Sequence, residues 1–306
     1  MLVKTNKITV IGSTNTDMVI KSPSLPRPGE TILGGTFFMT QGGKGANQAV
    51  TVARLGGDLV FVAKTGTDIF GQNTRDLLKK DGIDGKYLLT DSQHPSGVAL
   101  ITIDEQAENS IVVSSGANGY LLPDDLEQIA EVIGDAEIIL MQLEIPMETV
   151  EYVAEEAFTQ GKKVILNPAP GRVLSPRLLE KLYLITPNET EAEIISGVKI
   201  TNTRSAEQAA QRIHELGVSS VVITLGSKGA LIYSDSRFEL IPAIRVEAVD
   251  TTAAGDVFNG ALAVALSEGK LLPEAVRFAI SAAALSVTRL GAQDSVPYRH
   301  EIEKRN

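Results

Sequence analysis

Short runs rich in Val, Ile and Leu alternate with amphipathic stretches along most of the 306 residues. Apolar runs bounded by turn residues predict buried strands, and the periodic stretches between them predict helices. This alternation predicts a mostly parallel sheet with helices on both faces. We expect strands at 8–12, 59–64, 138–143, 163–167, 183–186 and 220–225. We expect helices at 46–55, 69–80, 123–133, 146–160, 205–216, 254–268 and 273–290.

Two segments interrupt this alternation. Segment 20–39 is rich in Pro and Gly, and 97–114 contains two strand-like runs, 98–103 and 110–113, around a polar turn. Such a pattern predicts a hairpin, which would form a small separate sheet and could cover a site as a lid. We therefore expect one α/β domain spanning 1–306, a three-layer sandwich with a mostly parallel central sheet and lid strands inserted from about 15–40 and 95–115.

Composition excludes several classes of function. The chain has no cysteine and a formal net charge of −10, which disfavours disulfides, thiolate metal sites and a nucleic-acid partner. No apolar stretch is long enough to predict a membrane span, and the N-terminus does not resemble a signal peptide. We expect a cytoplasmic protein that acts on small molecules without a membrane partner.

The segment 250–256 (Asp-Thr-Thr-Ala-Ala-Gly-Asp) is the first candidate for chemistry. A β-like run at 243–249 leads into this small-residue turn, and a helical pattern begins at its end. Backbone N–H groups at a helix N-terminus favour anions, so the turn could hold a phosphoryl group. Asp256 could then accept a proton from a substrate hydroxyl. The alternative is that Asp256 only caps the helix.

Two N-terminal segments could bind a polar small molecule. In 41–49 three glycines and Lys44 open a helix, with Asn47 one turn later on the same side. In 12–17 Asn15 and Asp17 follow the first strand and alternate in an extended segment. Both pairs could hydrogen-bond sugar hydroxyls. A ligand-free glycine turn and ordinary turn-forming Asn and Asp remain the alternatives.

Three further segments are ambiguous alone. Asn188 and Glu191 could reach a phosphate or hold the water shell of Mg²⁺, or they could form a capping box. The segment 224–229 could wrap a nucleotide or simply join two strands. Glu144, after the strand at 138–143, could hold a hydroxyl or could be a solvated loop acid.

Together these segments resemble the ribokinase branch of the PfkB carbohydrate kinase family, almost end to end. The segment 42–47 (Gly-Gly-Lys-Gly-Ala-Asn) is similar to the N-terminal signature of the family, and 250–256 is similar to its C-terminal signature. The segments 141–144, 167–170, 186–191 and 291–297 also resemble this branch. Six matching segments in the right order are a specific signal.

The resemblance implies a fold, an activity and a set of site residues. The fold would be a central α/β sandwich with a small β-sheet lid that also forms a homodimer contact. The activity would be transfer of the γ-phosphate of ATP to the 5-hydroxyl of D-ribose, with Mg²⁺ and with K⁺ as activator.

The resemblance also implies roles for individual residues. Gly255 would belong to the anion hole, and Asp256 would be the catalytic base and contact ribose. Ribose would be bound by Asn15, Asp17, Gly43, Lys44, Asn47 and Glu144. ATP would be contacted by Asn188, Thr224, Gly226, Gly229 and Gly255. A K⁺ loop would use Asp250, Thr252, Ser286, Arg289, Gly291 and Ser295, largely through backbone carbonyls, and Glu191 would act on Mg²⁺ through water.

Ile280 departs from some relatives, which place a polar residue near the adenine; this argues against a side-chain hydrogen bond to the base and leaves apolar packing open. Within the family, a kinase for deoxyribose, another sugar or a nucleoside is the main alternative. A non-catalytic sugar sensor is disfavoured by the intact Asp256, and an oxidoreductase by the lack of a G-x-G-x-x-G fingerprint.

Overall fold

The computed structural model describes residues 7–106 and 108–304. Residues 1–6, on which the expectation about the N-terminus rests, lie outside this range. The large sheet has nine strands, parallel throughout except for the last two strands of the chain. In spatial order they are β13 (Arg237–Ile241), β12 (Ala230–Ser234), β11 (Ser220–Thr224), β10 (Leu184–Ile185), β9 (Lys163–Leu166), β8 (Ile138–Met141), β1 (Ile8–Ile11), β4 (Leu59–Gly66) and β5 (Leu88–Asp91).

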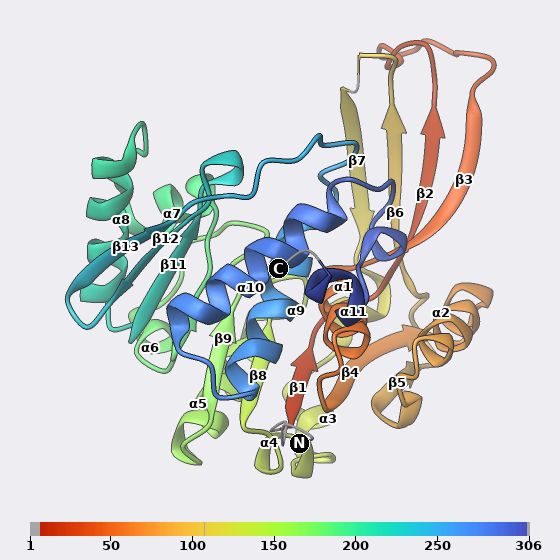
Figure 1. Ribbon diagram of the computed structural model, residues 1–306. Coiled ribbons are helices and arrows are strands. Elements are labelled where there is room, and N and C mark those ends of the chain that lie inside the picture. The colour runs from red at the N-terminus through yellow and green to blue at the C-terminus, as the bar shows by residue number, and fades with distance from the viewer. Residues whose placement is uncertain (1–6, 107, 305–306) are drawn as a thin grey trace.

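Helices cover both faces of this sheet (Figure 1). Alternate strand residues face opposite sides, so Ile8 and Val10 join one core and Ile11 joins the other. The first core is closed by α1 (Lys44–Arg54), α2 (Ile69–Lys80), α9 (Ala254–Ser267), α10 (Leu272–Ser286) and α11 (Arg299–Glu303). The second is closed by α3 (Pro123–Glu127), α4 (Glu131–Gly134), α5 (Met147–Thr159), α6 (Pro176–Leu179), α7 (Glu189–Ser196) and α8 (Thr203–Glu215). The expected three-layer sandwich is confirmed.

A second, four-stranded sheet projects from one end of the body (Figure 1). Its order is β3 (Thr36–Gly42), β2 (Asn15–Lys21), β6 (Gly97–Ile103) and β7 (Asn109–Ser114). The expected hairpin is present, because β6 and β7 pair antiparallel. Short 3₁₀ helices connect other elements: η1 (Gly85–Tyr87), η2 (Gly116–Tyr120), η3 (Gly226–Lys228) and η4 (Gln293–Ser295).

Two expectations about secondary structure are wrong. The run 243–249 is not a strand: β13 ends at Ile241, and the following Pro242 has no N–H to donate to a ladder. The segment then crosses to α10, where the Val287 carbonyl accepts from the N–H groups of Val249 and Asp250 at 2.7 and 3.2 Å. The expected helix at 123–133 divides into α3 and α4, joined by a tight turn. Within the described ranges, no helix combines the length and apolar character needed to cross a membrane.

Candidate active site

Several candidate residues meet at one edge of the large sheet because they follow the carboxyl ends of parallel strands. Asn15 comes shortly after β1, Glu144 after β8, Asn167 after β9 and Asn188, which precedes α7, after β10. The helices α1 and α9 begin elsewhere in the chain, and side-chain contacts bring their first turns here: the Lys44 N–H donates to Glu144, and Asp256 bonds to α1. Ligands of open α/β sheets bind at this edge, so strand order and helix packing together gather residues that are far apart in the sequence.

Asp256 lies in the first turn of α9 with only 5% of its surface exposed. Its Oδ2 accepts from Asn47 Nδ2 at 2.9 Å, and its Oδ1 accepts from Gln48 Nε2 at 3.0 Å. The N-cap position is Ala253, in a left-handed conformation with φ 59°. The capping interpretation of Asp256 is therefore wrong, because its carboxylate bonds to α1 and not to its own helix. Burial raises its pKa, while Lys44 opposes the shift.

Lys44 supplies the positive charge among several acids. Burial alone would lower the pKa of this ammonium, but the surrounding carboxylates outweigh burial and raise it. The site is thus a cation held among acids, and Lys44 stays charged at neutral pH. The carboxylates, in decreasing order of effect, are Asp256, Glu144, Glu191 and Asp17.

Asn15 and Asp17 open β2, the strand that leaves the body for the small sheet. Asn15 Oδ1 accepts from Asn118 Nδ2 at 2.8 Å. Burial, with a smaller contribution from the charge of Glu144, raises the pKa of Asp17 to about 7. A Cβ at Gly42 would lie 2.2 Å from Asp17 Oδ2, so the glycine is what lets β3 pass beside this carboxyl group.

Glu144 belongs to the site and is not a solvated loop acid. Its Oε2 accepts from Ser13 Oγ at 2.5 Å and from the backbone N–H of Lys44 at 3.0 Å. A pocket of about 500 Å³ lies beside it, a size suited to a small ligand. The residues that line this pocket include Asn15, Asn118, Glu144 and Arg172.

Asn188 and Glu191 form the capping box that the sequence allowed. Asn188 Oδ1 accepts from the Glu191 N–H at 2.8 Å, and Glu191 Oε2 accepts from the Asn188 N–H at 2.9 Å. Burial raises the pKa of Glu191, and the charge of Lys44 opposes the shift. Thr224 lies next to Asn188 through an isolated β-bridge. Gly226 and Gly229, with φ of 56° and 110°, shape the turn from β11 into β12, so this segment does join adjacent strands.

The residues expected around a K⁺ ion come from two loops that Asp250 ties together. Its Oδ1 accepts from the Thr252 N–H and its Oδ2 from the Gly291 N–H, both at 2.9 Å. The Arg289 side chain pairs with Glu301 at 2.6 Å, so Arg289 could serve a cation only through its backbone carbonyl. Ser286 is the last residue of α10, and Ser295, fully buried, lies in η4. Among the described residues, no group of three or more His, Cys, Asp or Glu side chains forms a metal site.

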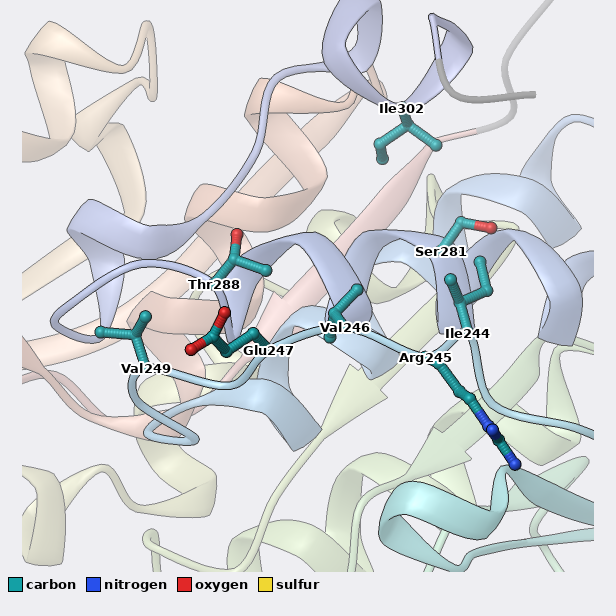
Figure 2. Close-up of a pocket in the computed structure, with 8 residues that line it drawn as sticks. All are labelled: Ile244, Arg245, Val246, Glu247, Val249, Ser281, Thr288 and Ile302. Atoms are coloured by element: carbon teal, nitrogen blue, oxygen red, sulfur yellow. The ribbon is translucent and has the colours of Figure 1, made fainter.

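A larger pocket of about 640 Å³ lies beside the loop 244–249 and the end of α10. Figure 2 shows its wall from Ile244 to Val249 facing Ser281 and Thr288, with Ile302 of α11 nearby. None of the site residues expected from the sequence lines it. Ile280, which the sequence left open as an apolar contact for adenine, is 8% exposed and belongs to the core around α10.

Besides Asn167, four residues of the site have no role predicted from the sequence: Ser13, Gln48, Asn118 and Gln142. Ser13 and Asn118 hold Glu144 and Asn15, and Gln48 bonds to Asp256 and to Gln142. All four side chains are buried polar groups. Polar residues inside otherwise apolar helix or strand patterns are the one signal that could have identified Gln48 and Gln142.

Comparison with known proteins agrees with this geometry. The model of the pfkB family carbohydrate kinase matches residues 5–299. A ribokinase from Haemophilus influenzae is 45% identical over 96% of both chains, and a deoxyribokinase from Salmonella typhi is 38% identical over 95% of both. The solved structure of Arabidopsis thaliana ribokinase complexed with ribose and ATP is 34% identical, with a TM-score of 0.91 over 98% of both chains.

Proposed function

The chain belongs to the pfkB family of carbohydrate kinases, and on that premise we propose that it transfers the γ-phosphoryl group of ATP to the 5-hydroxyl of D-ribose. The products are D-ribose 5-phosphate and ADP. The observation that carries the proposal is the buried carboxylate of Asp256, in the first turn of α9 and within hydrogen-bond reach of Asn47. A kinase for deoxyribose is the second candidate, because a deoxyribokinase is among the relatives.

The sugar would be held by side chains with free bonding capacity. Asn47 Oδ1 is buried and has no partner among the described residues, so it can accept a hydroxyl proton. Asp17 and Glu144 add carboxylate acceptors, Asn15 adds an amide, and Lys44 adds a charged donor. A polyhydroxylated ring satisfies such a mixture, whereas an apolar ligand would leave it unsatisfied.

The transfer step uses Asp256 as the base. The 5-hydroxyl oxygen attacks the γ-phosphorus, its proton passes to the Asp256 carboxylate, and the bond to the β–γ bridging oxygen breaks to release ADP. The first N–H groups of α9 have no intrahelical acceptor, so those of Gly255 and Asp256 can bind the transferred group. An ideal Cβ at Gly255 meets nothing within 4 Å, which fits an open approach for a phosphate.

ATP would lie along Asn188, Thr224, Gly226 and Gly229, whose segments adjoin this edge of the sheet. Mg²⁺ keeps several waters and takes few protein ligands, and the partly buried carboxylate of Glu191 suits contact through water. When bound, Mg²⁺ neutralises phosphate charge.

K⁺ prefers neutral oxygen ligands, which backbone carbonyls provide. The pairing of Asp250 with Gly291 brings the carbonyl-bearing loops 250–252 and 286–295 together, next to the turn that opens α9. We propose that the ion stabilises this turn and takes no part in bond making. ATP is the co-substrate, so we place the reaction in the cytoplasm.

The small sheet is proposed to act as a lid and as a homodimer contact. Large apolar side chains are exposed on its strands, which is unusual for a free surface: Ile20, Phe37, Phe38, Met39, Leu100, Ile111, Val112 and Val113. Light scattering after size exclusion should give a dimer mass. Val112→Asp should shift it towards the monomer, whereas Val173→Asp, at an exposed position in another segment, should not. A wild-type monomer at micromolar concentration would refute the dimer.

The experiment that tests the function is ADP release measured by a coupled assay with a panel of sugars, with and without K⁺. Ribose should give the highest kcat/KM. A higher kcat/KM with deoxyribose would favour the second candidate. ADP release that no sugar stimulates would refute both.

A further inference from the structure

A directed chain of buried amides ends on the Asp256 carboxylate. Gln142 Nε2 donates to Gln48 Oε1 at 2.6 Å, and Gln48 Nε2 donates to Asp256 Oδ1 at 3.0 Å and to Asn167 Oδ1 at 3.1 Å. Gln48 and Gln142 are 0% exposed. Neither glutamine can therefore touch a ligand in the site.

The carboxylate determines the direction of this chain. An ionised carboxylate only accepts hydrogen bonds, so Gln48 must turn its NH₂ towards Asp256 and towards Asn167 Oδ1. Its Oε1 is then left for the NH₂ of Gln142. A flipped Gln48 would place its oxygen against two acceptors, which an enclosed site penalises strongly.

Close helix packing places Gln48 beside Asp256. Gly260 lies one turn after Asp256 on α9, and a Cβ there would come within 2.6 Å of Thr51 Cβ and 2.9 Å of the Gln48 carbonyl oxygen. The glycine thus lets α9 approach α1 closely. At this separation a glutamine side chain spans the gap between the helices.

We propose that Gln48, whose Oε1 is held by Gln142, is a positioning residue that fixes the rotation of the Asp256 carboxylate for proton acceptance. This inference rests on the proposed function. Asn47 holds Oδ2 and Gln48 holds Oδ1, so each oxygen keeps its remaining lone pair for the substrate proton. A carboxylate clamped at both oxygens needs no reorientation when the hydroxyl arrives.

The same hydrogen bond affects when Asp256 is ionised. The charged groups that face Asp256 are Lys44 at the start of α1, Glu144 after β8 and Glu191 on α7. Burial raises the pKa of Asp256, whereas Lys44 and the amides of Asn47 and Gln48 lower it. Loss of the Gln48 amide should raise this pKa further. The acid limb of the kcat profile should then move to higher pH.

The test compares Gln48→Met and Gln142→Met with wild type and with Thr51→Val. Met keeps roughly the volume of Gln but cannot donate. Thr51 is a buried α1 residue whose Oγ1 bonds only to the Asn47 carbonyl among the described residues, so Thr51→Val changes polarity on the same helix without touching Asp256. For Gln48→Met we expect a drop in kcat of about ten-fold or more, an unchanged KM for the sugar, and an acid limb moved up by about one pH unit. Gln142→Met should give a smaller change in the same direction, and Thr51→Val should leave both the limb and kcat in place.

Three results would overturn the inference. One is a folded Gln48→Met enzyme with a wild-type acid limb, whatever its melting temperature, since a merely structural role changes stability and not the limb. Another is an equal shift in Thr51→Val. The third is a rise in sugar KM with kcat unchanged, which would make Gln48 part of sugar binding. Failure of the proposed function is distinct, because wild type would then show no sugar-dependent ADP release.

Discussion

Sugar binding should weaken as pH falls through neutrality, because ionised Asp17 accepts hydroxyl protons at both oxygens with the strength of a charged acceptor, whereas protonated Asp17 loses the charge and one acceptor. Its pKa of about 7 arises mainly from burial, with the negative charge of Glu144 adding to the shift and Lys44 opposing it. A carboxyl group with a raised pKa gains its proton early as pH falls. At about pH 5.5 only a few per cent of Asp17 remains ionised, so the sugar Kd should be roughly 30-fold higher than at pH 8.5, or about 2 kcal/mol.

Calorimetric titration of ribose into the nucleotide-free enzyme measures this directly. Near pH 7, binding should release about half a proton per sugar, which titrations in two buffers of different ionisation enthalpy will detect. Asp17→Asn is the matched control: its Kd for ribose at high pH should be higher than that of wild type, and the proton release should largely disappear. Nearly constant wild-type affinity between pH 5.5 and 8.5 would refute the reasoning, as would a pH dependence that Asp17→Asn retains.

The same pKa has a consequence for stability. The folded state binds the Asp17 proton more tightly than the unfolded chain does, since the pKa rises from 3.8 to about 7. The contribution of Asp17 to the free energy of unfolding is therefore fully present at low pH. Up to about 4 kcal/mol of it is lost as pH rises through 7. Asp17→Asn should accordingly raise the free energy of unfolding at pH 8 while weakening sugar binding. Denaturant titration would show this, and an equal or lower midpoint would contradict it.

Three other substitutions or exchanges test the site. Asp256→Asn should lower kcat roughly a thousand-fold by removing the base while ATP affinity by equilibrium binding stays within a few-fold; near-normal turnover would exclude the assignment. Gly43→Ala, at φ 86° with Thr14 Cα only 2.6 Å from the new Cβ, should lower kcat/KM at least ten-fold and reduce the melting temperature, whereas Gly56→Ala, at φ 82° in open space, should cost about 1 kcal/mol of stability and leave kinetics unchanged. Replacing K⁺ with Na⁺ should lower kcat in wild type but much less in Asp250→Ala, and equal rates with both ions in wild type would contradict the cation loop.

The sequence predicts most elements correctly because hydrophobic period and turn residues are local signals. Helix α2 has the predicted bounds Ile69–Lys80, and the strand β11 differs from its predicted range by one residue. The run 243–249 misleads because it passes beside α10 as a loop, with Ile244 and Val249 exposed, instead of pairing in a sheet.

The same distinction between local and long-range signals holds for the site. Glycine turns, helix starts and strand ends are local signals, and they mark Lys44, Asp17 and Asp256 as candidate site residues. The bond from Gln48 to Asp256 joins residues 208 positions apart, and no local pattern encodes it. Whether Asp256 caps its helix or faces α1 depends on packing that only the tertiary structure reveals.

The central position of β1 has a consequence for synthesis on the ribosome. β1 pairs with β4 on one side and with β8 on the other, so one of its edges must wait for residue 138 to be made. One face of α1 stays uncovered for longer during synthesis, because it packs against α9, which begins only at Ala254. A nascent chain thus carries the α9-facing side of α1 uncovered until Ala254 is made, and no product truncated before Asp256 can contain a complete site. Helix α9 both covers α1 and carries Asp256, so for this chain the step that closes this side of the core also brings the base to the site.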